Sequence, residues 1–510
     1  MVSFFGRTSP WYARTGSCDD PRTDTFDESL YYDVVQNHRG YDYLGEKLAS
    51  WGYIVVSINA NRGIHVGNRF GQDWDGGFIL SRANLVLRHL QKLKEWGDCT
   101  VDPNCQTPAS LGVDLRGKLD FSEVGMFGHS RGGQAVRAAY NLYKESGSVW
   151  PTRIQNLNVK GIYEVGPTDF ITRGGFAGED ITSKFTGSGT KWNILLPMCD
   201  GDVFFMAGMH SYDRMILNSV DNPATQKSTY TIWGTNHNFF NTVWTNNDGL
   251  CYNHDAIFSP TGSGSVEQRQ MAIVNAMAFF RANIGGGANA TFNQNFNPRY
   301  ESNPQVHKIT RVEQNFTPSP ESTFTVIFED FTTSTSAACS SGSNTCTVNG
   351  APDVSHAITK IPIYHDESLN VLRLNWSSSG NDKSLQINWR SLGSGANIED
   401  YETLDFRVAR THNGTNVLGN TNFSIQLVMA DDVLSNPITL CDYAKLDRSV
   451  GGINFFATPP QLEPKPLLQT VRIPLASFTN SDLTQIRGIK LTFNESPFGS
   501  IFLANIRFTK

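Results

Sequence analysis

The chain has 510 residues, of which 39% are hydrophobic and 18% are charged, an ordinary composition for a folded globular protein. This length predicts more than one domain. A formal net charge of −6 argues against a basic surface for nucleic acid. The apolar runs are only as long as strands, so the sequence predicts no membrane span.

The first half of the chain, residues 1–285, alternates apolar strands with helical segments. Strands are expected near 53–58, 124–128, 160–165, 193–198 and 229–233. Helices are expected near 41–50, 77–96, 131–145 and 267–283. Such alternation predicts a mostly parallel sheet with helices on both faces. We therefore expect an α/β domain over residues 1–285.

The most informative motif of this half is Gly128-His129-Ser130-Arg131-Gly132, which fits the G-x-S-x-G pattern of a nucleophile elbow. A strand-like run at 123–127 precedes it, and a helix-like run at 134–140 follows it. In such an elbow, a strained turn between strand and helix exposes the serine hydroxyl above the sheet. We therefore expect Ser130 to be a nucleophile rather than part of a Gly-Ser turn without chemistry.

A serine becomes a good nucleophile only when a base takes its proton. In hydrolases with this elbow, an acid and then a histidine follow the serine along the chain, each after a later strand. The expected strand at 229–233 leads into a turn that contains His237. His237 is therefore the expected base; the alternative is an ordinary surface histidine.

Two carboxylates compete for the role of the acid. The expected strand at 193–198 leads into Asp200 and Asp202, which stand two residues apart. Asp202, directly before Val203, fits the usual position after the strand and is the expected acid. Asp200 is the alternative acid, or a carboxylate that accepts hydrogen bonds within the turn.

These motifs resemble the α/β-hydrolase esterases. The segments Gly128–Gly133 (GHSRGG), Asp200–Val203, Gly234–Phe240 and Arg39–Val56 are similar to the branch that contains dienelactone hydrolases, cutinases and polyester hydrolases. The resemblance covers roughly residues 1–285. It implies an α/β-hydrolase fold and cleavage of carboxylic esters, but it does not name the substrate.

In the resembled branch, two backbone N–H groups bind the oxyanion. The first expected donor is the N–H of Arg131, directly after the nucleophile. The branch usually has a His-Gly pair after its first long core strand, whereas this chain has Phe5-Gly6 at that point. We place the second donor at Arg7. The strands that precede this point in the branch are missing, so we expect a catalytic domain without its first strands.

From about residue 323 the pattern changes to short alternating strands without long helices. The clearest runs are 324–328, 369–374, 384–389, 404–408, 423–428, 470–475, 486–493 and 501–508. They predict an all-β sandwich, similar to a jelly roll, over residues 323–510. An Asn- and Pro-rich stretch at 286–322 is expected to be a linker.

The closing strands of this second domain resemble those of galactose-binding-like and carbohydrate-binding sandwiches. We expect an accessory domain that binds a carbohydrate or a polymer surface. The aromatic side chains that could form a platform for sugars are Trp376, Trp389, Tyr401, Phe455 and Phe456. We expect most of them to belong to the core instead.

The chain has eight cysteines, and several are close in sequence. The expected disulfide pairs are Cys99–Cys105, Cys339–Cys346 and Cys199–Cys251, the last between the acid and base loops. Cys18 and Cys441 have no evident partner. Short loops closed by cysteines are typical of an oxidising compartment, and their spacing is not that of a zinc site. We expect a secreted protein, although the chain shows no signal peptide.

The sequence thus predicts a serine hydrolase that cleaves small, polymeric or carbohydrate-linked carboxylic esters through an acyl-enzyme. Ser130, His237 and Asp202 form the expected triad, and no metal, organic cofactor, nucleic acid or membrane span is expected. Two alternatives stay open. One is an amidase or peptidase of the same fold. The other is a non-catalytic carbohydrate-binding or adhesion protein with a degenerate hydrolase domain.

Overall fold

The computed structural model describes residues 2–5, 36–60, 71–72, 75–99, 105–172, 182, 190–217, 226–259, 261–300, 304–318, 323–331, 344–412, 416–454 and 458–510. The chain divides into two compact units. Unit 1 comprises Met1–Pro197, Thr235–Asp248 and Ile257–Phe292. Unit 2 comprises Met198–Gly234, Gly249–Ala256 and Asn293–Lys510.

Unit 1 contains a parallel sheet. Its strands run in the order β7 (Lys191–Pro197), β6 (Val159–Val165), β5 (Val124–His129), β1 (Val2–Phe5) and β2 (Val56–Ile58), and each neighbouring pair is parallel. Almost every residue of β5, β6 and β7 is buried. Continuous burial of this kind is typical of a parallel sheet whose two faces are both covered.

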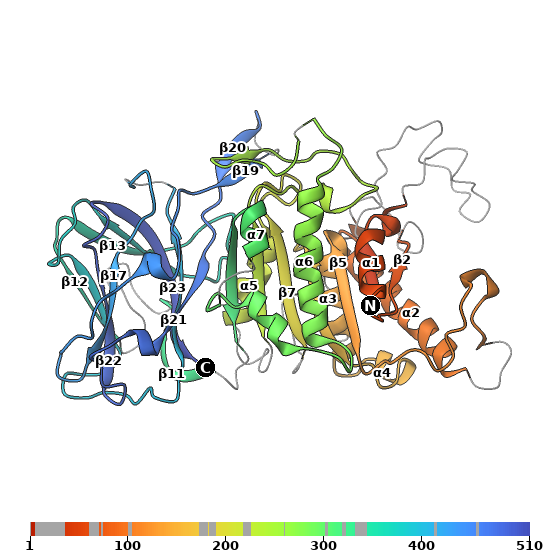
Figure 1. Cartoon of the computed structure of the whole chain (residues 1–510), viewed down its shortest axis with the longest axis horizontal. Helices are drawn as coiled ribbons and strands as arrows, with labels where there is room; N and C mark the ends of the chain where they lie inside the picture. Colours follow the sequence, from red (N-terminus) through yellow and green to blue (C-terminus); the bar gives the residue numbers. More distant parts are fainter. Residues whose placement is uncertain are drawn as a thin grey trace. The chain divides into compact units, whose positions relative to one another are not determined.

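Helices cover both faces of this sheet (Figure 1). On one face, α6 (Val266–Asn283) approaches so closely that a Cβ at Gly161 would lie 2.7 Å from the Phe279 ring. On the other face, α3 (Arg131–Lys144) approaches β5 at Gly128. In unit 1, α1 (Asp42–Ala49) packs beside α6, and α2 (Ile79–Asp98) packs beside α3. The expected arrangement of a parallel sheet between helices is confirmed.

The remaining described elements of unit 1 are short. They are η2 (Asn37–Arg39), β3 (Gly71–Gln72), β4 (Asp75–Gly76), η4 (Ala109–Leu111), α4 (Trp150–Arg153) and η5 (Asn238–Phe240). The finer assignment to the α/β-hydrolase fold stays a prediction.

Unit 2 contains a β-sandwich of two antiparallel sheets. One runs in the order β13 (Val354–Thr359), β14 (Val371–Trp376), β23 (Gly499–Thr509), β16 (Thr403–Arg410) and β21 (Gln469–Pro474), with β11 (Thr323–Glu329) also paired to β23. The other runs in the order β12 (Thr345–Asn349), β15 (Ser384–Asn388), β22 (Ile486–Thr492), β17 (Ser424–Met429) and β18 (Ile438–Thr439). The inward side chains of both sheets form one apolar core, so the predicted sandwich is confirmed.

Unit 2 also includes two elements from residues 1–285. They are α5 (Ala207–Leu217), a helix that the sequence did not predict, and β8 (Lys227–Ile232), which matches the expected strand at 229–233. On α5 the buried Asp213 carboxylate pairs with His365 Nδ1 at 2.7 Å and with Arg407 at 2.8 Å. Burial by itself raises the pKa of Asp213, but His365 and Arg407 outweigh it and hold that pKa at about 2. Because a buried charge must be paired, these contacts tie α5 to the sandwich.

The stretch expected to be a linker at 286–322 contains regular structure. It carries η6 (Ala290–Phe296), α7 (Pro304–Ile309) and β10 (Val312–Thr317). β10 pairs antiparallel with β8, and the buried Asn315 side chain donates to Leu468 O at 2.7 Å and accepts from Arg407 Nε at 2.8 Å. The Asn and Pro residues predict a loop from local pattern alone, but these distant partners give β10 a strand conformation.

Two disulfides are described, Cys99–Cys105 and Cys199–Cys251, and both predicted pairings are confirmed. Cys346 is also disulfide-bonded; its expected partner Cys339 lies outside the described residues, as does Cys18. Cys441 is a free, exposed cysteine. Disulfides of this kind are typical of an oxidising compartment.

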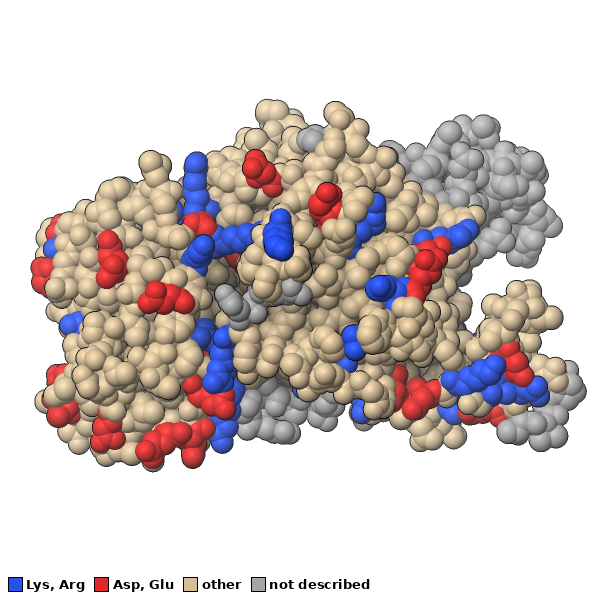
Figure 2. All heavy atoms as spheres, viewed as in Figure 1, with Lys and Arg blue, Asp and Glu red and all other residues tan. Residues whose placement is uncertain are grey.

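The surface carries few charges, and both signs are interspersed on the face shown in Figure 2. This pattern agrees with the slightly acidic composition and offers no concentrated basic patch on that face. Within the described part of the chain, no helix combines the length and the apolar composition needed to cross a membrane.

Candidate functional site

Ser130 stands at the turn between β5 and α3. Its backbone has φ 58° and ψ −128°, a positive φ that is uncommon and strained for a non-glycine residue. The turn is fixed on both sides, because Ser130 N donates to Val165 O at 2.9 Å and Gly133 N donates to Ser130 O at 2.9 Å. A strained serine between a buried strand and the first turn of a helix is the geometry of a nucleophile elbow.

Glycines allow the strand and the helix to approach at this turn. A Cβ at Gly128 would overlap the backbone of Gly132 and Gly133. A Cβ at Gly133 would lie 3.0 Å from the Cβ of Pro167 and 3.4 Å from Gly128 O. The motif therefore has glycine at these two positions because a larger side chain would collide with the neighbouring backbone and side-chain atoms.

Arg131, the expected first oxyanion donor, is the first residue of α3. N–H groups in the first turn of a helix have no acceptor within the helix, and the helix dipole there favours negative charge. The Arg131 guanidinium lies 5.7 Å from the centre of the Phe170 ring. Arg7, the expected second donor, lies outside the described residues.

Gln134, a buried residue of α3, fixes the loop that follows β6. Its side-chain oxygen accepts from Thr168 Oγ1 and from Phe170 N, both at 2.9 Å. Its Nε2 donates to Phe170 O at 2.6 Å, and Thr168 N donates to Ser130 O at 3.4 Å. These hydrogen bonds hold the loop beside the elbow, and no motif in the sequence marks Gln134 for this role.

A buried ion pair lies against the same helix. Arg137 Nε of α3 donates to Glu164 Oε1 of β6 at 3.0 Å, and Trp192 Nε1 donates to the same oxygen at 2.7 Å. Burial raises the pKa of Glu164, and the Arg137 charge opposes that shift. The pair anchors α3 to the sheet close to the elbow.

His237 lies beside the elbow within unit 1. It is fully buried and directly precedes η5. Its ring centre lies 4.5 Å from the ring centre of His129, the residue before Ser130. The structure therefore brings together the elbow and the histidine that sequence analysis selected as the base, although they are more than a hundred residues apart.

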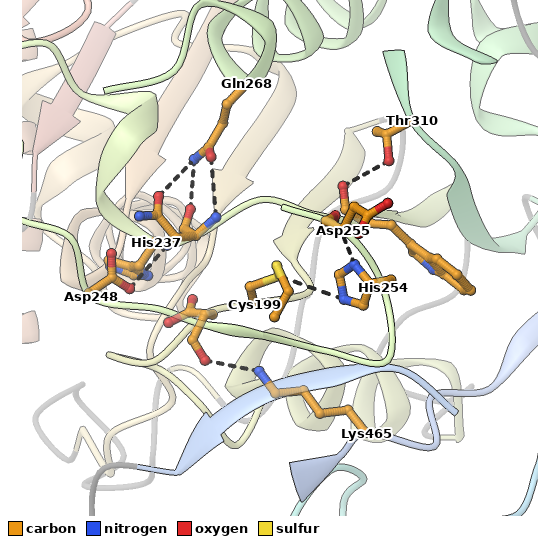
Figure 3. The surroundings of a disulfide bond; sticks show 12 residues. Cys199, His237, Asp248, His254, Asp255, Gln268, Thr310 and Lys465 are labelled. Carbon is orange, nitrogen blue, oxygen red and sulfur yellow. Dashed lines mark hydrogen bonds between the residues drawn. A yellow bond between two sulfur atoms is a disulfide. The ribbon is translucent and has the colours of Figure 1, made fainter. Parts of the chain in front are cut away.

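Two side chains that sequence analysis missed hold the backbone on either side of His237 (Figure 3). The Asp248 carboxylate accepts from His237 N at 3.1 Å and from Asn238 N at 2.9 Å. Gln268 of α6 accepts from Asn236 N at 3.2 Å and donates to Asn236 O at 2.7 Å. The signal in the sequence that could have pointed to Asp248 is that Asp and Asn side chains often form hydrogen bonds with the backbone of turns.

The two candidate acids belong to unit 2. Asp200 is 1% exposed, and its Oδ1 accepts from Asp202 N at 2.9 Å and from Val203 N at 2.6 Å. Asp200 therefore has the turn-bonding role that the sequence left open for it. Asp202 has a half-buried side chain. The choice of Asp202 over Asp200 as the acid stays a prediction.

Among the described residues, one group places three possible metal ligands together, namely Cys199, Cys251 and His254. The two sulfurs form a disulfide, so neither is the thiolate that a zinc site needs. His254 Nε2 lies 3.6 Å from Cys199 Sγ, and the two side chains face each other in Figure 3. Burial lowers the pKa of His254 and so favours the neutral form of the ring.

No protein-family model and no curated protein matches this chain. Solved structures that match include a family 30 carbohydrate-binding module of a cellulosomal cellulase of Clostridium thermocellum, 13% identical, with a TM-score of 0.23 over 32% of this chain and 88% of the module. A family 11 module of a cellulosomal cellulase of the same organism is 14% identical, with a TM-score of 0.23 over 36% of this chain and 91% of the module. A module specific for non-crystalline cellulose is 17% identical, with a TM-score of 0.21 over 32% and 87%. The likeness concerns the β-sandwich fold alone.

Proposed function

We propose that this protein is a serine hydrolase that cleaves carboxylic esters. The main support is the backbone of Ser130, a buried non-glycine residue held at φ 58° between β5 and α3. Strain of this kind costs roughly 1–3 kcal/mol and is retained mainly at functional sites. The proximity of His237 to the elbow, through its 4.5 Å ring contact with His129, adds a base of the required type.

In the proposed reaction, Ser130 Oγ attacks the ester carbonyl carbon while His237 accepts the hydroxyl proton. The oxyanion forms beside the N–H group of Arg131, and Arg7 remains the second donor expected from the sequence. The bond to the alcohol then breaks, His237 protonates the leaving oxygen, and the acyl group stays on Ser130. A water molecule deprotonated by His237 hydrolyses this acyl-enzyme. Asp202 orients the imidazole and stabilises its protonated form.

Hydrolysis of p-nitrophenyl acetate by the full chain tests the proposal. We expect a burst of about one p-nitrophenol per protein molecule, because acylation of Ser130 precedes slower deacylation. A p-nitroanilide with the same acyl group is the control for the amidase alternative, which predicts that the anilide is cleaved with the higher kcat/KM. Turnover of neither compound, nor of a panel of esters that includes a polyester film, contradicts the proposal.

A second candidate function is binding of carbohydrate by the outer face of the sheet that contains β15 and β22. Thr347, Gln386, Lys490 and Gln426 stand side by side across four strands of this sheet. Their sequence neighbours point into the core, so these four side chains point outward. Adjacent strands are about 4.8 Å apart, which makes a row of polar groups about 14 Å long. Amide and hydroxyl groups can donate to and accept from sugar hydroxyls, and the Lys490 ammonium can donate to them.

The aromatic residues singled out in the sequence do not provide a platform for this candidate. Trp376, Trp389 and Tyr401 are at most 8% exposed and belong to the sandwich core, as expected. Phe455 and Phe456 lie outside the described residues. Recognition of a sugar by this face therefore rests on hydrogen bonds of the polar row.

Retention of the full chain on insoluble polysaccharides tests the second candidate. We expect replacement of both Gln386 and Gln426 by Ala to weaken retention by at least about tenfold, because a net hydrogen bond contributes about 1 kcal/mol. Ser355→Ala, an exposed position on β13 of the other sheet, is the matched control and should leave retention unchanged. Equal retention of the wild type and the double Gln variant, or no retention of the wild type, contradicts the candidate.

A further inference from the structure

A β-hairpin near the C-terminal end of the chain pairs with a short strand from the middle of the chain. β19 (Gly451–Asn454) and β20 (Gln461–Pro464) form a three-stranded antiparallel sheet with β9 (Cys251–Tyr252). Within this sheet, Gly452 stands opposite Cys251. We call β19, β20 and the following Lys465 the arm. All of these residues belong to unit 2.

The arm packs directly on the backbone of Cys199. A Cβ at Gly452 would lie 3.1 Å from Cys199 Cα and 3.2 Å from Cys199 C, so a larger residue at this position would push the two backbones apart. The Cys199–Cys251 disulfide joins Cys199 covalently to β9, the strand that pairs with β19 of the arm. The arm and the disulfide therefore restrain the beginning of the segment Cys199–Val203, which we call the acid loop.

Lys465 restrains the next residue of the acid loop. Lys465 is 2% exposed. Its Nζ donates to Asp200 O at 2.9 Å, the bond drawn from Lys465 in Figure 3, and to Met206 Sδ at 3.5 Å. Lys465 is 265 positions from Asp200 in the sequence. Burial of an ammonium group is costly unless acceptors compensate for the lost water.

The rest of the acid loop depends on the residue that Lys465 holds. The Asp200 carboxylate accepts the N–H groups of Asp202 and Val203, while its carbonyl accepts the Lys465 ammonium. Loss of the Lys465 contact would therefore loosen Asp200 and, through it, the backbone of Asp202. The position of the Asp202 carboxylate follows from that of its backbone.

We propose that the arm positions the acid loop and that Lys465 is a positioning residue for the catalytic acid. The inference rests on the proposed ester hydrolysis, with Asp202 or Asp200 as the acid. It gives the C-terminal part of the chain a role in catalysis in addition to any binding of a polymer surface.

Lys465→Met tests the inference, because Met has a similar length but neither the charge nor the donor. We expect kcat for p-nitrophenyl acetate to fall by about 10²-fold, the size of effect seen when reacting groups are slightly misplaced, with KM changed by less than about twofold. Lys465→Arg, which keeps the charge and the donor, should recover most of the activity. Lys360→Met, an exposed lysine of the same unit, is the matched control and should keep wild-type kcat.

Amide hydrogen exchange of residues 199–206 provides a readout that does not depend on activity. We expect Lys465→Met to exchange faster in this segment, whereas Lys360→Met exchanges like the wild type. If Lys465→Met does not fold, Gly452→Ala disturbs the same loop through its Cβ and serves as the second variant.

Unchanged exchange in Lys465→Met overturns the positioning of the loop by the arm. Faster exchange with an unchanged kcat overturns the role of that positioning in catalysis. A wild-type protein without esterase activity overturns the proposed function and the catalytic part of the inference, and the exchange rates then decide whether the arm holds the loop. Faster exchange together with a lower kcat and recovery by Lys465→Arg supports the whole inference.

Discussion

Replacement of Ser130 by Ala is expected to lower kcat for ester hydrolysis by about 10⁶-fold, as removal of the nucleophile does in triad enzymes. The remaining rate would come from the oxyanion donors and from substrate binding. The fold should survive, because the hydrogen bonds of Ser130 to Val165 and Gly133 are made by backbone atoms. Steady-state kinetics with p-nitrophenyl acetate measures the loss, and thermal unfolding checks the fold.

Two controls separate loss of the nucleophile from general damage. Ser122→Ala changes an exposed serine of unit 1 and should keep wild-type turnover. A fluorophosphonate should label the peptide that contains Ser130 in the wild type and in Ser122→Ala, but not in Ser130→Ala. A Ser130→Ala protein that retains more than about a hundredth of wild-type turnover would remove Ser130 from the mechanism.

His237→Ala should cost a factor similar to that of Ser130→Ala, because nucleophile and base act as one unit. The double variant should then be no slower than either single variant, since losses within such a unit do not add. Two independent losses that multiply in the double variant would show that His237 acts elsewhere.

Asp202→Asn is expected to lower kcat by about 10⁴-fold, because an amide in place of the carboxylate stabilises the wrong imidazole tautomer. Asp200→Asn should change kcat by less than about tenfold. Its amide oxygen can still accept from the backbone N–H groups of Asp202 and Val203. We expect this second variant to lose only about 1 kcal/mol of stability.

The same kinetic assay, with thermal unfolding as the check on folding, decides between the two carboxylates. A large loss of kcat in Asp200→Asn, with wild-type kcat in Asp202→Asn, would identify Asp200 as the catalytic acid and leave the reaction class unchanged. Normal activity in both variants would show that neither carboxylate orients the base.

Local sequence patterns predicted the main elements well. The continuous apolar runs gave β5, β6 and β7, and the change from helical to alternating periodicity gave most strands of the sandwich. These patterns succeed because a half-buried strand buries every second side chain. A strand covered on both faces buries every side chain and therefore reads as a continuous apolar run. The Ser130 elbow was equally readable, since its glycines are required by local geometry.

The helix α5 and the strand β10 could not be predicted in the same way. The sequence predicted no helix at α5 and a linker at β10. Asp213 of α5 pairs with His365 and Arg407, and β10 pairs with β8. A paired buried carboxylate such as Asp213 has no periodic signature, because it depends on one partner far away in the sequence.

The sequence by itself determined the parallel α/β and sandwich architectures, the tight turn at Ser130 and the Cys199–Cys251 pairing, whereas the catalytic roles of Ser130 and His237 stay predictions. Only the tertiary structure showed that Asp248 and Gln268 hold the His237 turn and that Lys465 holds Asp200. The physical reason is that secondary structure and tight turns follow from neighbours in the chain. A buried side chain that bonds a distant backbone group is set by the fold, and a single sequence contains no local record of that contact.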